Sequence, residues 1–136
     1  MKDFKFELVS PVKLVFSDQI SMIVLPGEEG YFGVLKNHMP MVSQLRTGLL
    51  EIYKNDRTES EKIFFIEGGV AEIDHDSCTV LAETIYDKDN MNLEDLLKKE
   101  SEIELTLDSL SNNLDKKNAL AKLESIQEFI RLLNVS

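Results

Sequence analysis

Apolar and polar side chains alternate along the first part of the chain, as they do in strands with one buried face. The first apolar row runs from Phe4 to Leu8. Ser10-Pro11 ends it, and the same alternation resumes at Val12. Period-2 alternation bounded by a Ser-Pro break is typical of two successive strands. The chain is therefore predicted to open with a pair of half-buried strands.

A polar break at residues 17–19 precedes the segment from Ile20 to Leu25, which is rich in β-branched residues and nearly all apolar. Such a run predicts a strand buried on both faces. Gly68-Gly69 later interrupts a strand pattern, which indicates a bulge or a tight hairpin, and residues 74–77 are expected to form a turn. Further short strands are expected at 42–46, 48–54, 62–66, 70–73 and 78–82, with a polar loop at 55–61. Many short strands without intervening helices predict an antiparallel β-sandwich.

The hydrophobic period changes after Tyr86. Residues 87–90 are a polar joint, and Asn92 is a suitable N-cap for a helix whose first turn carries Glu94 and Asp95. Two narrow stripes at 3/4 spacing follow, apolar except for Glu100, which predicts two helices packed antiparallel as a hairpin. The stripes are Leu93, Leu96, Glu100, Ile103, Leu107, Leu110 and Leu114, then Ala119, Leu123, Ile126, Ile130 and Leu133. The predicted fold is α+β, with a sandwich domain at 1–86 and a linker and hairpin at 87–136.

Charge and hydropathy narrow the classes of partner. The formal net charge is −10 and the sequence pI is near 4.6, whereas binding to a phosphate backbone needs clustered Lys and Arg. Nucleic acid and direct docking on an anionic lipid surface are therefore disfavoured. No apolar run approaches the roughly 18 residues of a membrane-spanning helix. Any association with a membrane is expected to go through a protein partner.

The sequence offers little for catalysis or for cofactor binding. Cys78 is the one cysteine, which excludes a disulfide within the chain and favours a reducing compartment. It alternates with Val80 and Ala82, so an inert place in an apolar strand face is expected. Asp74, His75, Asp76 and Cys78 are metal-ligand types in close sequence, but a turn explains the cluster better, since His38 is the only other histidine. We expect no catalytic site, no metal and no cofactor.

Gly, Pro and Asn residues concentrate between Pro26 and Leu50, in PGEEGYFGVLKNHMPMVSQLRTGLL. Glycines allow the chain to reverse tightly, and Pro40 keeps the residue before it extended. His38 has two readings: it holds its loop through a backbone hydrogen bond, or it contacts a partner protein. Tyr31 and Phe32, aromatic side chains on a glycine-rich loop, favour a protein contact.

This stretch, with FELVSPVKLVFS upstream and FFIEGGVAEI and TVLAE downstream, resembles the epsilon subunit of F-type ATP synthases. That bacterial subunit is equivalent to the mitochondrial delta subunit. The resemblance is collinear from Phe4 to Glu83. It implies a β-sandwich followed by a two-helix hairpin, in a non-catalytic subunit of the central stalk. Its partners in the family are the gamma subunit and the ring of c subunits, with the catalytic head as a further partner of the hairpin. The implied location is peripheral, on the cytoplasmic face of the bacterial inner membrane.

Site residues follow from the resemblance motif by motif. Glu28, Glu29, Tyr31 and Phe32 correspond to the end that faces the c-ring. Ser10, His38, Met39, Pro40 and Ser43 fall where the family meets gamma. Some relatives carry an acid where this chain has Tyr31, so an aromatic contact is expected at that position.

The hairpin departs from relatives that bind ATP. Their motif has Ile or Leu, Asp, two variable residues, Arg and Ala at the start of the first helix. The matching run here is Leu93-Glu94-Asp95-Leu96-Leu97-Lys98, with Leu97 in place of the arginine. The polyphosphate would lose its guanidinium partner. No nucleotide binding is therefore expected. Only a weak regulatory effect of the hairpin on ATP hydrolysis is expected, because residues 91–136 carry a net charge of −3 and gain little Coulomb attraction along an acidic part of the catalytic subunits.

A second class of function stays open on the sequence alone. The chain could be a free-standing sandwich that binds a small ligand or carbohydrate and dimerises through its hairpin. An enzyme of unknown type has no constellation of residues behind it. Co-purification distinguishes the rotor subunit from the free-standing module, because a rotor subunit should be recovered with gamma and a free-standing module should not.

Overall fold

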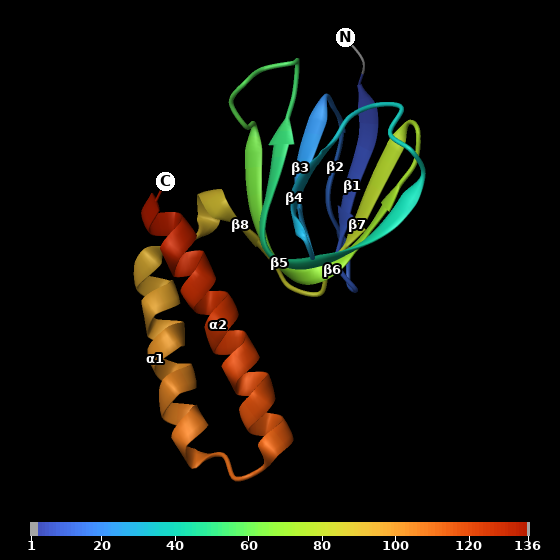
Figure 1. Ribbon diagram of the computed structural model, residues 1–136. Helices are drawn as coiled ribbons and strands as arrows, with labels where there is room; N and C mark the ends of the chain where they lie inside the picture. The colour runs from blue at the N-terminus through green and yellow to red at the C-terminus, as the bar shows by residue number, and fades with distance from the viewer. Residues whose placement is uncertain (1–2, 136) are drawn as a thin grey trace. The chain divides into compact units, whose positions relative to one another are not determined.

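The computed structural model describes residues 3–135, with side chains through residue 133. The chain divides into two compact units, one up to residue 89 and one from residue 90 onward. Figure 1 shows the strands of the first unit and the two helices of the second. The strands are β1 (Phe4–Val9), β2 (Leu14–Ile20), β3 (Met22–Gly27), β4 (Gly30–Val34), β5 (Met41–Tyr53), β6 (Lys62–Ile73), β7 (Ser77–Leu81) and β8 (Ile85–Asp87).

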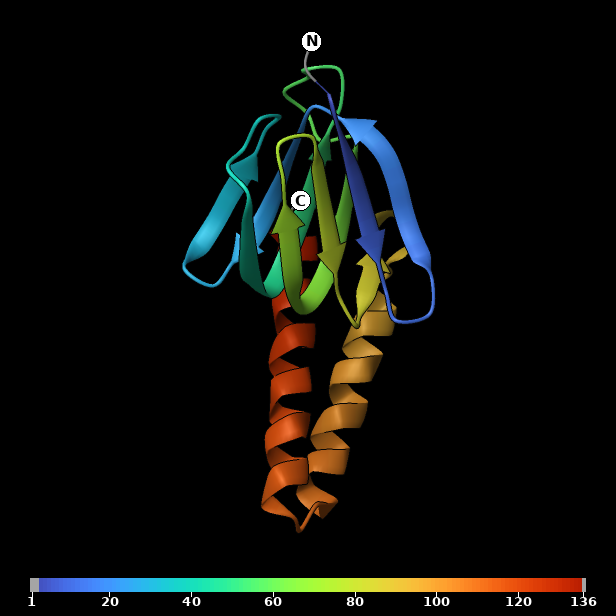
Figure 2. The ribbon, with the colours of Figure 1, turned by 90° about the vertical axis from the view of Figure 1, so that its right-hand side faces the viewer.

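The first unit is one hydrogen-bonded sheet that folds over on itself into a sandwich. The strand order is β2-β1-β7-β6-β5-β3-β4, and β8 pairs with β6. Neighbouring strands are antiparallel apart from β1 and β7, which run parallel over Lys5 to Val9. Figure 2 shows β1 beside β7 and β6, with the β3–β4 hairpin at the other edge. The predicted β-sandwich is confirmed, and the parallel pair is an addition that the local sequence pattern did not indicate.

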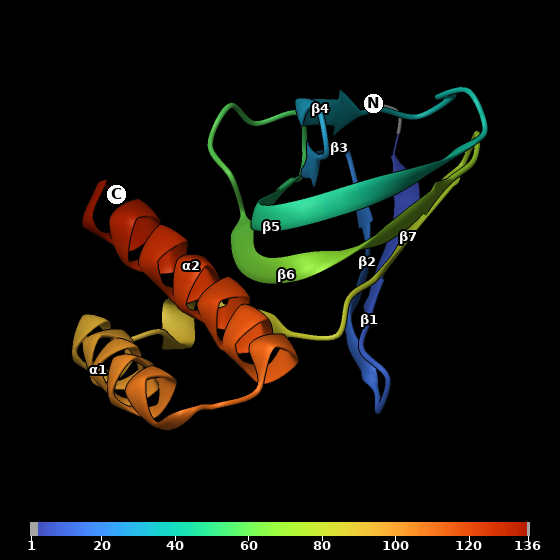
Figure 3. The same ribbon diagram turned by 60° about the horizontal axis from the view of Figure 1, so that its bottom comes forward.

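Two long strands carry the chain around the corner of the sandwich, as Figure 3 shows for β5 and β6. Their pairing keeps one register from Met41 opposite Ile73 to Ile52 opposite Lys62. The buried positions nevertheless change parity, from Leu45 to Leu50 on β5. Strands that switch layers in this way bend at the corner. The prediction of two short strands in each of these segments was therefore wrong.

Glycines make this corner possible on β6. Gly68 and Gly69 have φ values of 77° and 149°, which L side chains rarely adopt. A Cβ on Gly69 would also lie 2.4 Å from the carbonyl oxygen of Leu81 on β7. The pair marks neither a register-shifting bulge nor a hairpin between β5 and β6, which corrects the sequence prediction. It allows one strand to bend while its ladder continues.

A single apolar cluster fills the sandwich. Its members come from alternate positions of the strands, which is the pattern that the sequence predicts for half-buried strands. Two details differ from the predictions. Met22 and Val24 are half-buried, so β3 is not covered on both faces, and residues 17–19 belong to β2 rather than to a break. The fully covered members include Phe6, Leu8, Ile20, Ile23, Leu25, Leu50, Ile52, Ile66, Ala71 and Val80.

The break between β2 and β3 lies at Ser21 instead. This side chain is buried, and its hydroxyl donates to the carbonyl of Tyr53 at 3.0 Å and accepts from the amide of Asp56 at 3.2 Å. Asn55 and Asp56 have positive φ values in the predicted polar loop. Ser21 therefore links the β2–β3 connection to the loop that follows β5.

The sequence predicts a polar joint at residues 87–90. The structure has a short strand, β8, at Ile85–Asp87, which the sequence analysis missed. β8 pairs with β6, with Ile85 opposite Ile66, and a 3₁₀ turn follows at Lys88–Asn90. The ammonium of Lys62 on β6 lies 2.5 Å from Asp87 and 3.2 Å from Asp89. The start of the joint is thus held on the sheet.

The second unit is the predicted antiparallel hairpin of α1 (Leu93–Ser109) and α2 (Asn113–Val135). The Asn92 side chain accepts from the Glu94 amide at 2.8 Å, so the predicted N-cap is confirmed. Asn112 accepts likewise from the Leu114 amide at 2.7 Å at the start of α2. The predicted stripes are covered or half-covered as far as Leu133, except Leu114, which is 63% exposed. The stripes also omitted Phe129, which is buried.

Candidate protein-contact surfaces

The Glu28–Glu29 turn joins β3 to β4 at an exposed edge. Gly27 and Gly30 pair directly across it, so only two residues form the turn. Both glutamates are exposed, and no hydrogen bond or ion pair is recorded for either among residues 3–135. Gly30 has a φ of 138°, which explains the need for glycine there. The turn presents two unpaired carboxylates to solvent.

The aromatic residues beside the turn are anchored to the sheet. The Tyr31 hydroxyl accepts from the Leu49 amide on β5 at 3.0 Å. The guanidinium carbon of Arg46 lies 5.1 Å from the Tyr31 ring centroid, and Arg46 Nε donates to the Gly27 carbonyl at 3.2 Å. Phe32 is half-buried and packs against the core cluster. Of the four residues expected to face the c-ring, only the two glutamates are free of structural contacts.

The loop at residues 35–40 lies at the opposite end of β4 from this turn. Asn37 has a φ of 69°, and its amide donates to the carbonyl of His75 in the β6–β7 turn at 2.6 Å. His38 Nδ1 lies 2.8 Å from the Met39 carbonyl, so the ring supports its own loop, which is the first of its two readings. Met39 is 78% exposed. Of the three residues expected to meet gamma here, Met39 and Pro40 are exposed and His38 is half-buried.

Ser10 lies in the β1–β2 turn and is used within it. Its hydroxyl accepts from the Lys13 amide at 3.2 Å and donates to the Lys13 carbonyl at the same distance. The preceding residue, Val9, pairs with Leu81 at the far end of β7. β7 starts at the turn that binds Asn37. The structure therefore places Ser10 and the 35–40 loop at opposite ends of β7.

Ser43 lies between the two groups of expected contacts. β5 covers roughly 13 Å from Met41, opposite Ile73, to Leu45, opposite Gly27. Ser43 is midway along this stretch, where it lines an open hollow of about 520 Å³ together with Glu28, Glu29 and the rest of the turn. The structure thus brings one expected gamma residue to the surface that was expected to face the c-ring.

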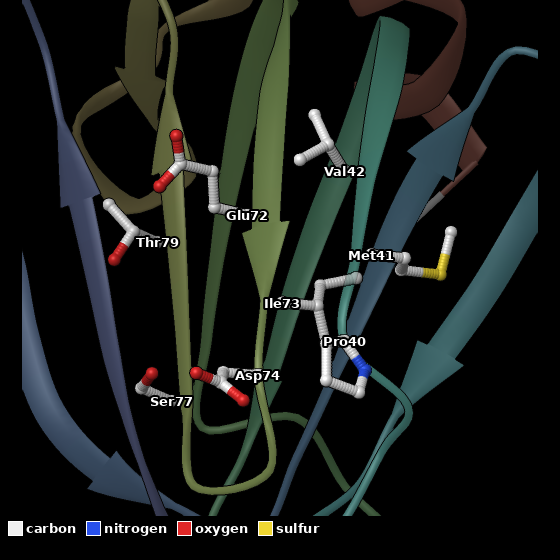
Figure 4. Close-up of a pocket in the computed structure, with 8 residues that line it drawn as sticks. All are labelled: Pro40, Met41, Val42, Glu72, Ile73, Asp74, Ser77 and Thr79. Carbon is white, nitrogen blue, oxygen red and sulfur yellow. The ribbon is translucent and has the colours of Figure 1, made fainter.

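One exposed sheet face joins Ser10 to the 35–40 loop, and the sequence analysis did not single out its residues. Thr79 pairs with Glu72, which pairs with Val42, so the three side chains form a row on one face of β7, β6 and β5. Leu81 and Val70 form the next row. Figure 4 shows the first row above Pro40, in a hollow of about 450 Å³. The alternation of buried and exposed positions in residues 70–81 was the sequence signal that could have identified this exposed face.

The cluster of metal-ligand types does not form a metal site. Cys78 is buried in the core cluster, while Asp74 and His75 are exposed in the turn. Burial raises the pKa of the Cys78 thiol to about 12, which keeps it protonated and unreactive at neutral pH. Among residues 3–135, no three His, Cys, Asp or Glu side chains are grouped to hold a metal ion. The turn reading is confirmed for Asp74 to Asp76, while Ser77 already begins β7.

Comparison with known sequences shows the family of this chain. The family profile "ATP synthase, Delta/Epsilon chain, beta-sandwich domain" matches residues 3–88. An ATP synthase epsilon chain of Rhodospirillum centenum is 34% identical over 132 residues, which are 95% of this chain and 90% of the relative. The chain belongs to the delta/epsilon family of ATP synthase. The epsilon chain of Paramagnetospirillum magneticum is 36% identical over 115 residues, 85% of each chain.

Solved structures agree on the fold. A chain in the cryo-EM structure of the Euglena gracilis mitochondrial ATP synthase, "OSCP/F1/c-ring in rotational state 1", matches with a TM-score of 0.80 at 19% identity, covering 98% of this chain and 82% of that one. A chain of the Tetrahymena thermophila central stalk and c-ring structure matches with a TM-score of 0.64 at 14% identity, covering 98% and 99%. At such identities the likeness concerns the fold.

Family membership makes the chain a non-catalytic, epsilon-type subunit of ATP synthase. The predicted family and the predicted absence of a catalytic function of its own are confirmed by the curated relatives. Neither helix, within the described residues, is long and apolar enough to cross a membrane.

Proposed function

We propose that this chain couples the gamma subunit to the ring of c subunits during proton-driven ATP synthesis. The observation that carries the proposal is the match to epsilon chains over 95% of the sequence, which includes both the sandwich and the hairpin. The chain would reach the membrane only through these partners. Its place would be peripheral, on the cytoplasmic face of a bacterial inner membrane.

The ring contact would be made by the end of the β3–β4 hairpin, Glu28 to Phe32. Two exposed, unpaired carboxylates on a short turn support this assignment, since charged rim residues steer encounter and fix register. The hairpin of α1 and α2 would add a weak regulatory contact with the catalytic head. Residues up to 90, which include β8 and the Lys62 pairs, would suffice for coupling.

The gamma contact would comprise Ser10, His38, Met39 and Pro40, together with the sheet face that lies between Ser10 and the 35–40 loop. Ser43, which lines the hollow beside the Glu28–Glu29 turn, would contact gamma where the gamma and ring surfaces meet. Exposed apolar side chains support this, with Val42 70% and Leu81 46% exposed. Apolar residues interspersed with polar ones on rigid strands are the usual composition of a protein interface. Ser10 and His38 would act mainly by shaping the two ends of this surface, because the Ser10 hydroxyl and His38 Nδ1 are hydrogen-bonded within their own turns.

Two charge-changing variants test the two surfaces in the reconstituted enzyme. Glu28→Lys with Glu29→Lys should lower proton-driven ATP synthesis severalfold while recovery with gamma is unchanged. Met39→Asp, at an exposed position of the other surface, should reduce recovery with gamma. The same defect from both variants would refute the two-surface assignment. Failure of the wild-type chain to be recovered with gamma would favour the free-standing ligand-binding module.

A further inference from the structure

We propose that Arg46 and Tyr31 are positioning residues that hold the Glu28–Glu29 turn in its contact geometry, a role that rests on the proposed ring contact of that turn. The pair, called here the Arg46–Tyr31 clasp, reaches both ends of the turn. Arg46 Nε donates to the carbonyl of Gly27, the last residue before the turn, at 3.2 Å. Tyr31, the second residue after it, accepts from the Leu49 amide at 3.0 Å.

The turn needs this outside support because of its own backbone. Two-residue hairpin turns match the strand twist best when their central residues have positive φ, which is why Asn and Gly dominate there. Glu28 and Glu29 are not among the residues with positive φ, and Gly30 takes that conformation instead, at 138°. A turn whose central residues lack positive φ matches the twist of its strands less well. Contacts to β5 on both sides of the turn help to keep the hairpin paired up to Gly27 and Gly30.

The fit of Tyr31 on β5 is close. A Cβ on Gly48 would lie 2.6 Å from the Tyr31 hydroxyl oxygen and 2.9 Å from the Pro26 Cβ. Real Cβ atoms do not approach so closely, so glycine at 48 is required for Tyr31 and Pro26 to cover the strand. Gly48 is accordingly buried. The clasp is therefore packed against backbone and not only hydrogen-bonded.

The geometry of Arg46 also leaves the glutamates available. Its guanidinium serves the Gly27 carbonyl and lies over the Tyr31 ring at 5.1 Å, and no ion pair with Glu28 or Glu29 is recorded among the described residues. A planar guanidinium can donate and stack at once, which a lysine ammonium cannot. The turn is thus held while both carboxylates face a partner. A contact ordered before binding costs less entropy when it forms.

Backbone hydrogen exchange of the full chain measures the clasp without any partner. In Tyr31→Phe the ring stays over Arg46 but the hydroxyl is lost, so exchange at the Leu49 amide should rise about fivefold. In Arg46→Lys the charge stays but the Gly27 bond and the stacking are lost, so exchange at residues 28–31 should rise by a similar factor. Arg57→Lys, at an exposed arginine of the 55–61 loop, is the matched control and should change neither.

The reconstituted enzyme gives the second readout. Arg46→Lys should lower proton-driven ATP synthesis about two- to fivefold with recovery on gamma unchanged, and Arg57→Lys should change neither. Wild-type exchange at residues 28–31 in Arg46→Lys would overturn the clasp. Suppose instead that Arg46→Lys raises exchange at residues 28–31, while ATP synthesis is normal both in Arg46→Lys and in the double variant Glu28→Lys, Glu29→Lys. That result would support the clasp and would overturn the ring contact on which its functional role rests.

Discussion

The sandwich and the hairpin cover their apolar side chains to very different extents. In the sandwich, strands from β1 to β7 contribute to one contiguous cluster, and Phe6, Leu8 and Leu50 are fully covered. In the hairpin, Leu96 is the only buried residue of α1, while Leu105 is 74% exposed and Leu114 63% exposed. The sandwich has a core in the usual sense, and the hairpin has a narrow seam.

The two regions should therefore differ in stability. Burial of apolar surface contributes about 25 cal/mol per Å², so a contiguous core outweighs a half-covered stripe. Most of the stability of a helix in a protein comes from the packing of its apolar face, so the helices of 17 and 23 residues depend on their seam. The sandwich is thus suited to a fixed structural role. The hairpin is suited to small regulatory changes.

The largest effect should come from truncating the core. Phe6→Ala removes a fully buried ring and should lower the free energy of unfolding of the sandwich by about 3 to 5 kcal/mol. Ile103→Ala, in the half-covered seam, should lower that of the hairpin by only about 1 kcal/mol. Urea titrations of the full chain would compare the two.

Two spectroscopic signals separate the regions in this experiment. The chain has three tyrosines and no tryptophan, and Tyr31, Tyr53 and Tyr86 all precede residue 90. Tyrosine fluorescence therefore reports the sandwich, while helical circular dichroism reports mainly α1 and α2. Equal shifts of both signals in Ile103→Ala would contradict the separation of the two regions.

A smaller effect is expected at the joint between the regions. Lys62 is 24% exposed and lies between Asp87 and Asp89, and the hydrogen bond with Asp87 is the main cause that raises its pKa above the ordinary value. Lys62→Met should lower stability by about 1 kcal/mol at neutral pH and speed exchange of the β8 amides. Lys54→Met, which removes the pair with Asp18 instead, is the matched control and should leave β8 exchange unchanged.

The pH dependence of this difference has a definite sign. A lysine with a raised pKa in the folded state contributes its full stabilisation below the unfolded value of 10.5. The contribution is lost as the pH rises through the folded pKa. The stabilities of wild type and Lys62→Met should therefore converge in strong alkali. A constant difference across that range would show that the lysine stem, and not its charge, stabilises the joint.

Local patterns predicted much of this fold. The alternation of apolar and polar residues predicted the first strand, and the change of hydrophobic period after Tyr86 predicted the helical hairpin. The corner of the sandwich was missed because Gly68-Gly69 interrupts the pattern locally, while the ladder with β5 continues through it. Whether a glycine pair ends a strand or bends it depends on pairing with residues some twenty positions away. β8 was missed because it has only three residues, too few to show a period.

The contact residues were less predictable for a related reason. The glycine-rich stretch indicated exposed turns, and Glu28, Glu29 and Met39 are indeed exposed. Composition could not show that the Tyr31 hydroxyl binds an amide 18 residues later, or that Phe32 joins the core. Side chains at turns divide between holding the turn and facing a partner. That division depends on which distant strand lies behind them.

The smallest effect should be that of nucleotide on the hairpin. Leu97 occupies the arginine position of the nucleotide motif and is 43% exposed on α1, so a triphosphate at the start of this helix lacks its bidentate guanidinium partner. Lys98, one position on, points about 100° away around the helix. Calorimetry of the isolated chain with Mg-ATP should therefore detect no binding up to millimolar nucleotide. The triple variant Glu94→Asp, Leu97→Arg, Lys98→Ala restores the motif and should bind more tightly than wild type.

Removal of the hairpin should likewise have little effect on ATP hydrolysis by the assembled enzyme. Removal of residues 91–136, which keeps β8 and the Lys62 pairs in place, should change ATP hydrolysis by less than about twofold, or roughly 0.4 kcal/mol in the barrier. The hairpin offers a triphosphate few converging cations, because Lys98 and Lys99 at its start are followed by Glu100, Glu102 and Glu104. A regulatory response to ATP would need a binding energy that these groups do not supply. Millimolar or tighter binding by wild type, or a severalfold rise in hydrolysis on truncation, would show that the hairpin senses nucleotide or inhibits the enzyme without that arginine.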